Sequence, residues 1–279
     1  MGTQTQNTQK RKSYPSDMSE NGWKKLKKAL FERIESKKKI KEGRPSADLK
    51  GVINAIFYVL KSGCTWRMLP NDFSNWSTVY GYFSRWSKDG TWEFINAWFV
   101  DKLRRKSERK GNPSAGIMDS QSVKHTAIGS EAYGYDAGKK ITGIKRFILA
   151  DTQGLLLVVT VCAASVSEKA GAMELIRRIM NIKIVRMLCQ KIRLVWADSG
   201  YRGEELSRFA RGRLSWKIQV VKRNDKVSGF EVLPRRWVVE RTFAWLNQNR
   251  RLSKNYEFNT KNSESMVYIA SIRLMMGRL

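Results

Sequence analysis

Apolar side chains in the N-terminal part of the chain recur at helical spacing, which is typical of amphipathic helices. This pattern predicts helices over residues 23–40, 47–62, 77–89 and 91–105, after a flexible polar lead over residues 1–20. Ser46 and the Ser77-Thr78 pair are the expected N-caps, and Gly63 and Gly90 are the expected stops. We therefore predict an all-helical domain of helix–turn–helix character over residues 21–105.

The pattern changes after residues 106–114, a charged stretch with Gly and Pro that we interpret as a linker. Short apolar runs predict strands over Ala115–Met118, Arg146–Asp151, Leu155–Ala164, Ile192–Ala197 and Lys217–Val221. Helical spacing predicts helices over Ser167–Ile182, Glu204–Arg211, Trp237–Arg250 and Ser263–Met276, and residues 129–143 are expected to form a loop. This order predicts an α/β domain over residues 115–279, an RNase H-like mixed sheet flanked by helices.

Charge narrows the choice of partner. The chain has 279 residues, and its 53 Lys and Arg against 25 Asp and Glu give a formal net charge of +28. This excess favours a polyanionic partner, above all nucleic acid. A membrane role is disfavoured, since the longest apolar run, Gly154–Ala164, is too short to span a bilayer. The polar start, MGTQTQNTQKRKS, lacks the apolar region of a signal peptide, so we expect a cytoplasmic protein.

Cysteine and histidine usage excludes several kinds of site. Cys64, Cys162 and Cys189 lie in apolar surroundings without a CxxC pair, so we expect free thiols and neither disulfides nor a zinc site. His125 is the only histidine, which leaves no histidine cluster for a metal and no nucleophile-elbow triad. Any metal chemistry must therefore use carboxylates.

Three acids are placed where such chemistry needs them. Asp119 and Asp198 each follow a predicted strand, and strand carboxyl ends border the ligand crevice of an open α/β sheet. Glu240 lies in the predicted helix 237–250 among apolar residues, where an acid is costly unless it is paired or binds metal. Taken alone, an Asp after a strand is more often a helix cap or a turn residue than a catalytic group. A single Glu in such a helix is likewise more often a partly exposed surface acid. If they converge, hard oxygen ligands favour Mg²⁺ or Mn²⁺.

Three longer motifs surround these acids. They read GIMDSQSVK around Asp119, WADSGYRGEEL around Asp198, and LPRRWVVERTFAWLNQNRRLSKNYE around Glu240. The segments NAIFYVLKSGCTWRMLPNDFSNWSTVYGYFSRWSKDGTW and YGYDAGKKITGIKRFILADTQGLLL add to the pattern. Together they resemble bacterial insertion-sequence DDE transposases of the insertion-sequence-five group (IS4/IS5-like), over roughly residues 44–279. The chain departs from the family pattern at Phe147, where we expect histidine, and at Ser199, where we expect glycine.

The resemblance implies a function. It implies a transposase that binds the terminal inverted repeats of an insertion sequence as double-stranded DNA and uses Asp119, Asp198 and Glu240 as catalytic metal ligands. Two Mg²⁺ ions about 4 Å apart, for which Mn²⁺ can substitute, activate the attacking water or 3′-hydroxyl in such sites. Because two DNA ends must be held together, a homodimer or larger assembly on DNA is expected, in the bacterial cytoplasm at the nucleoid.

Basic residues near these motifs are the expected DNA contacts. Phosphate contacts add affinity and salt dependence with little base specificity. For phosphates flanking the cut, we expect contacts from Arg235, Arg236, Arg241, Arg250, Arg251 and Lys254, and from Lys124, Lys139, Lys140, Lys145 and Arg146 on the other wall of the cleft. Favourable charges at a helix C-terminus explain Arg250 and Lys254 equally well. The run Lys24–Lys41 is either a DNA-tracking arm or a solvated helix face.

Sequence readout is expected from the helical domain, through Arg67, Ser77, Thr78, Arg85 and Lys88. The spacing of Trp66, Trp76, Trp86, Trp92 and Trp98 favours core packing over base stacking. Four functions stay open at this point. They are a transposase, a nuclease of the same fold, a domesticated or decayed transposase-derived protein that binds DNA without catalysis, and a structural RNA-binding protein. An intact set of three acids favours the first two.

Overall fold

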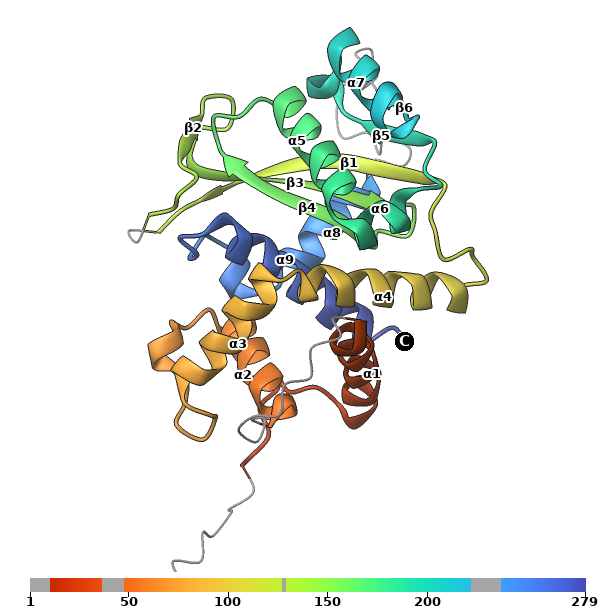
Figure 1. Cartoon of the computed structure of the whole chain (residues 1–279). Coiled ribbons are helices and arrows are strands. Elements are labelled where there is room, and N and C mark those ends of the chain that lie inside the picture. The colour runs from red at the N-terminus through yellow and green to blue at the C-terminus, as the bar shows by residue number, and fades with distance from the viewer. Residues whose placement is uncertain (1–10, 37–47, 127–128, 222–236) are drawn as a thin grey trace, which may run out of the picture.

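The computed structural model describes residues 11–36, 48–126, 129–221 and 237–279. They form a mixed sheet covered by helices on both faces, above a layer of N-terminal helices (Figure 1). The N-terminal layer contains α1 (Glu20–Ser36), α2 (Leu49–Ser62), the short helix η1 (Trp66–Met68), α3 (Trp76–Lys88) and α4 (Thr91–Lys106). The predicted helices over 47–62, 77–89 and 91–105 are thus confirmed to within two residues.

The residues that cap the helix ends were predicted correctly at some positions and wrongly at others. Gly63 ends α2 as predicted, in a left-handed conformation with φ of 77° that glycine adopts without steric cost. The N-cap of α2 is Asp48, whose carboxylate accepts from the Lys50 N–H, while Ser46 lies outside the described residues. Asn75 caps α3 by accepting from the Ser77 N–H. The predicted Ser77-Thr78 cap was therefore wrong by two residues, because Ser77 already belongs to the first turn.

The sheet has six strands in the described residues, arranged around β1. The strands are β1 (Ala115–Lys124), β2 (Gly134–Asp136), β3 (Ile141–Asp151), β4 (Leu156–Ala163), β5 (Leu194–Ala197) and β6 (Lys217–Val220). β3 pairs antiparallel with β1 on one side and with β2 and β4 on the other, and β5 and β6 run parallel to β1 beyond it. The predicted RNase H-like mixed sheet is confirmed.

The remaining helices cover the two faces of this sheet. They are α5 (Glu168–Asn181), α6 (Lys183–Cys189), the short helix η2 (Ser199–Tyr201), α7 (Glu204–Leu214), α8 (Trp237–Asn247), the short helix η3 (Arg250–Leu252) and α9 (Thr260–Met276). Helix α6 and strand β2 were not predicted. Strand β1 continues to Lys124, so Asp119 lies within the strand and not beyond its end. Buried and less buried side chains alternate from Asp119 to Ser122, as they do in a strand, although all four are polar.

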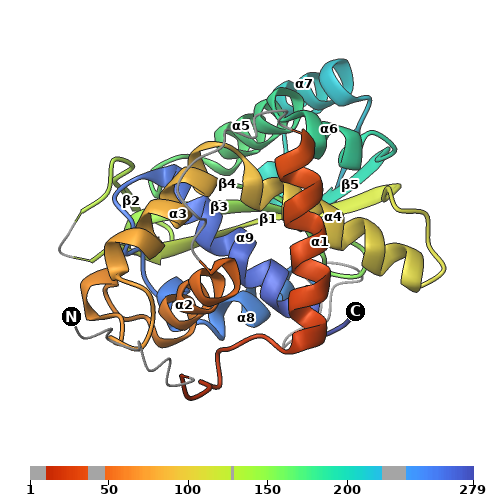
Figure 2. The same cartoon turned by 60° about the horizontal axis from the view of Figure 1, so that its bottom comes forward.

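Helix α9 is the centre of the molecule. It packs against β4 and α8 on one side and against α1, α2, α3 and α4 on the other, as Figures 1 and 2 show. Twelve of its residues are buried, including polar Asn262, Ser263 and Ser265. Buried side chains of the N-terminal helices and of the sheet belong to one continuous hydrophobic core. The apolar residues of α9 from Met266 to Ile272, together with Met275, are therefore core, while Leu274 is only half-buried.

A buried ion network crosses this core. Arg178 of α5 donates to Glu93 of α4 (Nη2 to Oε1, 3.0 Å) and pairs with Glu264 of α9 (Nη2 to Oε2, 2.6 Å). Glu264 also accepts from the Val161 N–H of β4 at 3.2 Å. Isolated buried charges are costly, so each of these groups holds its partners in place. The network joins the sheet, α5, α9 and the N-terminal layer.

No described helix is both long and apolar enough to cross a membrane.

Close packing between α5 and β3 gives a test of the fold. A Cβ added at Gly171 would lie 2.0 Å from the ring of Phe147. We expect Gly171→Ala to lower the free energy of unfolding by about 1–3 kcal/mol through overpacking, as measured by urea denaturation. Gly212→Ala in α7 is the matched control, since a Cβ there has no neighbour within 4 Å. The control should be neutral or slightly stabilising. Equal effects of both changes would contradict the packing described.

The buried network also predicts a pH dependence. Burial raises the pKa of Glu264 to about 7 from the usual 4.5, against the opposing charge of Arg178. The folded state therefore binds this proton more tightly than the unfolded state does. The stabilisation from this proton is present at low pH and is lost as pH rises from about 4.5 to 7. Urea denaturation across this range should show a smaller decline for Glu264→Gln than for the wild type. Glu174→Gln, at an exposed site on α5, should follow the wild type.

Candidate active site

Asp119 and Asp198 come together through the pairing of two strands. β1 and β5 run parallel, with Ala115 opposite Leu194 and Ile117 opposite Trp196. Continuing this register by two residues brings Asp119 level with Asp198, which directly follows β5. Adjacent strands lie about 4.8 Å apart, so the two carboxylates belong to one site. Asp198 also caps η2, where its Oδ1 accepts from the Gly200 N–H at 2.9 Å.

The side chain of Asp119 is directed by the alternation of the strand. Its neighbour Ser120 donates to Glu168 of α5 (Oγ to Oε1, 3.4 Å), and Phe147, which pairs with Ser120, packs on Gly171 of α5. Because successive side chains point to opposite faces, Asp119 points away from α5. The other face of β1 and β3 is covered by α8. Asp119 therefore points to the face on which the helix of Glu240 packs.

Glu240 itself is exposed. Its neighbours Val238, Val239, Thr242 and Phe243 form the buried face of α8, while Glu240 lies on the solvent side. The argument that an apolar environment makes this acid costly was therefore wrong, because helical geometry separates neighbours in sequence onto different faces.

Asp119 and Asp198 carry carboxylate oxygens, the kind of donor that Mg²⁺ and Mn²⁺ prefer. The pair Asp119 and Asp198 fits such an ion by donor chemistry and by strand register. Within the described ranges, however, no group of three or more His, Cys, Asp or Glu side chains is arranged to hold a metal ion. The described structure thus assembles two members of the predicted triad and leaves Glu240 on the helix that covers the same face.

Two residues that sequence analysis missed border the aspartates. Tyr201 is buried, and desolvation, followed by the charge of Asp119, raises the pKa of its hydroxyl well above the usual value. Asp198 and Glu168 act in the same direction. Glu168 begins α5 beside Gly200, whose added Cβ would lie 3.1 Å from its Cγ. Glu168 stands in the sequence without any signal of this position, and only the fold brings it to the loop after β5.

Lys145 and Arg146, predicted to contact DNA, are buried inside the sheet. The Nζ of Lys145 pairs with Asp136 at 3.3 Å and Glu168 at 3.2 Å, and it donates to the Val166 carbonyl. Arg146 donates to the Leu252 carbonyl at 2.8 Å, and burial lowers its pKa to about 10. Neither arrangement supports a phosphate contact. These residues instead anchor the start of α5 and the segment after α8 to the sheet.

Arg251 differs from its predicted role in the same way. Helix α8 ends at Asn247, so Arg251 does not continue the face of Glu240. It is buried and donates to Glu257 (Nε to Oε1, 2.8 Å) and to the Cys64 carbonyl (Nη1, 2.9 Å). Half-buried Arg241 stacks between the rings of Trp237 and Trp245, at 4.4 and 4.5 Å from their centroids. The structure supports a phosphate contact for neither arginine.

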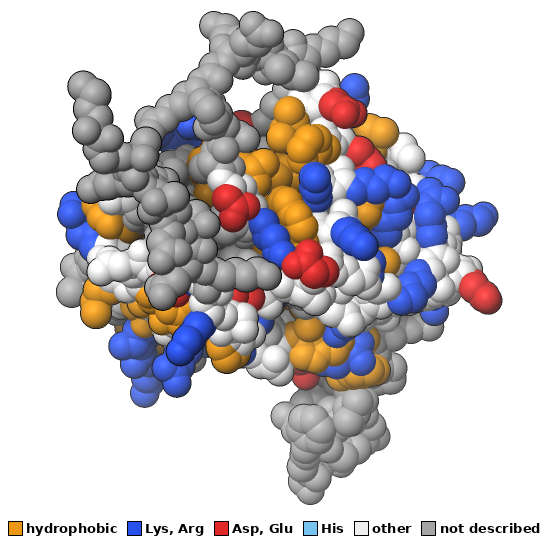
Figure 3. All heavy atoms as spheres, turned by 90° about the horizontal axis from the view of Figure 1, so that it is seen from below, with side chains coloured by type: hydrophobic (Ala, Val, Ile, Leu, Met, Phe, Trp, Pro, Cys, Tyr) orange, Lys and Arg blue, Asp and Glu red, His pale blue; other side chains and the backbone are white. Residues whose placement is uncertain are grey.

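The other predicted DNA contacts within the described residues are exposed. They are Arg67, Ser77, Thr78, Arg85, Lys88, Lys124, Lys139, Lys140, Arg250 and Lys254. Arg235 and Arg236 lie outside the described residues. In α1, Lys24, Lys27 and Lys28 are exposed while Leu26, Ala29 and Leu30 are buried. Figure 3 shows Lys and Arg side chains gathered over one side of the face formed by the helical layer. The strong positive charge of the chain is thus displayed at the surface.

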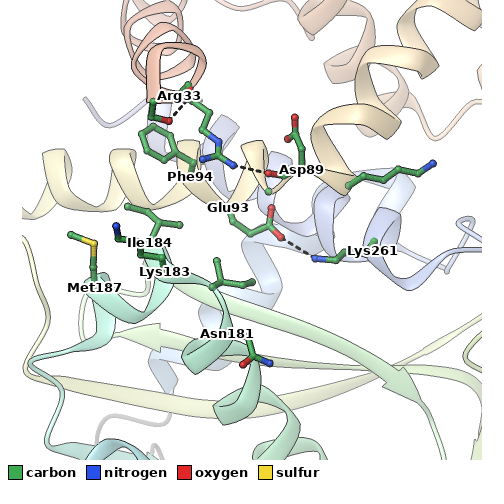
Figure 4. Close-up of a pocket in the computed structure, with 13 residues that line it drawn as sticks. Arg33, Asp89, Glu93, Phe94, Asn181, Lys183, Ile184, Met187 and Lys261 are labelled. Carbon is green, nitrogen blue, oxygen red and sulfur yellow. Dashed lines mark hydrogen bonds and ion pairs between the residues drawn. The ribbon is translucent and has the colours of Figure 1, made fainter. Parts of the chain in front are cut away.

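A cavity of about 570 Å³ lies between α1, α4, α6 and α9, away from the aspartates (Figure 4). Arg33 enters it over the ring of Phe94 and donates to the Asp89 carbonyl. Glu93 and Lys261 face each other at 3.8 Å. Among the residues predicted to contact DNA, only Lys88 lines this cavity. Glu93 and Lys261 pair with each other, and Arg33 is bound to the backbone. We therefore interpret this cavity as a gap between packed helices and not as a reaction site.

Comparison with known families agrees with this geometry. Residues 110–275 match the family described as "Transposase DDE domain", and residues 18–96 match "Putative transposase of IS4/5 family". The first match covers more than half of the chain. The chain therefore belongs to the DDE transposase family, in its IS4/IS5 group of insertion-sequence proteins. The predicted family membership is confirmed.

The individual proteins that resemble this chain match it over only part of its length or at low sequence identity. The chain is 35% identical over 116 residues to the "Putative transposase for insertion sequence element IS402" of Burkholderia cepacia. That alignment covers 41% of this chain and 54% of the relative, so the chain spans about half the length of this curated relative. The solved "Mos1 transposase paired-end complex with left transposon end" aligns over 67% of this chain and 64% of its own, with 10% identity and a TM-score of 0.24.

The buried position of Arg251 can be tested directly. We expect Arg251→Met to lower the free energy of unfolding by about 3–5 kcal/mol, because it leaves Glu257 buried without a partner. Arg250→Met is the matched control at an exposed neighbour and should change stability by less than about 1 kcal/mol. Chemical denaturation provides the measurement. An Arg251 variant of unchanged stability with weakened DNA binding would restore the phosphate role predicted from sequence.

Proposed function

We propose that the protein is a DNA transposase that binds the terminal inverted repeats of an insertion sequence, then cuts the DNA and joins it to a target. The observation that carries this proposal is the parallel pairing of β1 with β5, which brings Asp119 level with Asp198. Glu240 completes the catalytic set, and its position on α8, which covers the face to which Asp119 points, supports that role.

The acids hold the reacting groups in place. Asp119 lies inside a ten-residue strand that is paired on both sides, so its backbone position is fixed. Asp198 is held by the Gly200 N–H, which donates to its Oδ1 at 2.9 Å. Two Mg²⁺ ions bound by Asp119, Asp198 and Glu240 would supply Lewis-acid activation of the attacking oxygen and stabilisation of the leaving oxygen. Closure of Glu240 onto the aspartates is expected when metal and DNA bind.

DNA binding follows from the surface charge. Exposed Arg67, Arg85 and Lys88 on the helical layer, and Lys124, Lys139 and Lys140 at the far end of β1 and β3, are proposed to contact phosphates on either side of the cut. Such contacts make affinity fall steeply with salt. Two DNA ends must be held at once, so we propose that the active form is a dimer or a larger assembly on DNA.

A substitution separates catalysis from binding. We expect Asp198→Asn to reduce Mg²⁺-dependent cleavage and strand transfer by roughly a thousandfold, since losing a metal ligand removes several kcal/mol of transition-state stabilisation. Affinity for DNA carrying the element's ends should stay within a few-fold of the wild type. Asp101→Asn in α4, distant from the site in sequence and paired with Arg105, is the control and should remain active.

The possible outcomes of this assay distinguish the open functions. Joined product from the wild type supports the transposase. Cleavage without joined product favours a nuclease of the same fold. Tight DNA binding with no cleavage under Mg²⁺ or Mn²⁺ would instead favour a transposase-derived protein that binds DNA without catalysis.

A further inference from the structure

A second cavity, of about 520 Å³, lies where the helical layer meets the segment that follows α8. Its volume is within the range of pockets that bind small ligands. One wall comes from η1 and α3, and the other from residues 251–259 and the start of α9. It is lined by Thr65, Trp66, Arg67, Trp76, Tyr80, Arg251, Tyr256, Glu257, Phe258, Asn259 and Asn262.

Aromatic rings dominate this cavity. Trp66, Trp76 and Tyr80 are half-exposed, whereas Trp86 and Trp92 of the same helical layer are buried in the core. Phe258 on the opposite wall is 60% exposed, although burial of such a side chain is favourable. Trp66 and Trp76 also pack against the core, but only in part, so each has an exposed portion that borders the cavity together with Phe258. Flat aromatic ligands stack on such rings.

The cavity also contains an amide without a partner. Asn262 is only 8% exposed, and its side chain forms no hydrogen bond within the described residues. Its neighbours differ, since Asn255 and Asn259 both use their amides in hydrogen bonds. Neither polar atom of this amide is fully buried, so the amide is accessible from the cavity. Asn262 therefore offers one donor and one acceptor, the pair of groups with which asparagine reads the edge of a base.

A cation lies beside these groups. The guanidinium of Arg67 rests 4.5 Å from the centroid of Trp76 and, within the described residues, forms no ion pair. Arg67 is exposed, so its charge is available to a phosphate outside the cavity. Stacking on Trp76 holds the guanidinium in place, which reduces the entropy lost on binding. Aromatic walls, a free amide and an adjacent cation together match the chemistry of one nucleotide.

We propose that this cavity binds a single unpaired nucleobase of the DNA, with its ring against Trp66 and Trp76, its edge on Asn262 and its phosphate on Arg67. A paired base cannot enter, because its faces and its pairing edge are already occupied in the duplex. The site rests on the proposed function in one respect, since it requires that the protein binds DNA. It would make the protein sensitive to a distorted duplex or a strand end.

Paired and unpaired probes test this site. The probes are a duplex with one unpaired 5-iodouracil and the same duplex fully paired, each incubated with the full chain. We expect the unpaired probe to bind about tenfold more tightly, the gain from one stacked base. On irradiation, the iodouracil should crosslink to Trp66, Trp76, Tyr80 or Phe258, as mapped by mass spectrometry.

Substitutions identify the cavity as the source of the preference. Asn262→Ala and Trp76→Ala should remove most of the tenfold preference while binding of the paired probe stays within a few-fold. Trp76→Phe, which keeps a ring, should retain part of the preference. Asn181→Ala and Trp98→Ala are matched controls outside this cavity and should behave as the wild type. Should Asn262→Ala fail to fold, exposed Arg67→Gln provides the second test and should weaken the preference.

Two failures are distinguishable. Equal affinity for both probes, or crosslinks that map outside the cavity, would overturn the nucleobase site and leave DNA binding intact. Absence of binding to either probe at low salt would overturn the proposed function together with this site.

Discussion

The structure depends on the burial of α9 between the sheet and the helical layer. Its buried acid Glu264 can be buried only because it is paired with Arg178 of α5 and accepts from the backbone of β4. Through Glu93, the same network reaches α4. The helical layer is therefore attached to the sheet by both hydrophobic contact and directed ion pairs. The exposed cations of the helical layer are therefore held at a fixed position relative to the aspartates of the sheet.

The candidate active site uses the opposite side of this framework. Parallel pairing of β1 and β5 brings the two aspartates together, and each side chain also accepts from a nearby backbone N–H. Buried Tyr201 and half-buried Glu168 lie near them, and the charges of all three acids raise the pKa of the Tyr201 hydroxyl. Glu240 belongs to a helix whose apolar face is held against β1 and β3 while the acid remains in solvent.

Sequence alone predicted what depends on local pattern. Helical spacing of apolar residues predicted α2, α4 and α9. Apolar runs that end in an acid predicted the two strands that lead to Asp119 and Asp198. Burial of individual charges was not predictable, because Arg251 and its exposed neighbour Arg250 have the same chemistry and differ only in tertiary contacts. For this reason, the DNA contacts predicted for Lys145 and Arg146 were wrong, and the position of Glu168 near the aspartates was missed. Trp76 packs against the core as predicted, but sequence did not show that its exposed portion borders a cavity.

The position of α9 in the chain has a genetic consequence. It follows every other described element, yet the core of the N-terminal helices closes around it. A frameshift or stop codon shortly before Thr260 would leave all three acids in the reading frame and still remove the helix against which α1, α2, α3 and α4 pack. Inactivated copies of such a gene can therefore keep every catalytic codon, and intact acids alone do not identify a working copy.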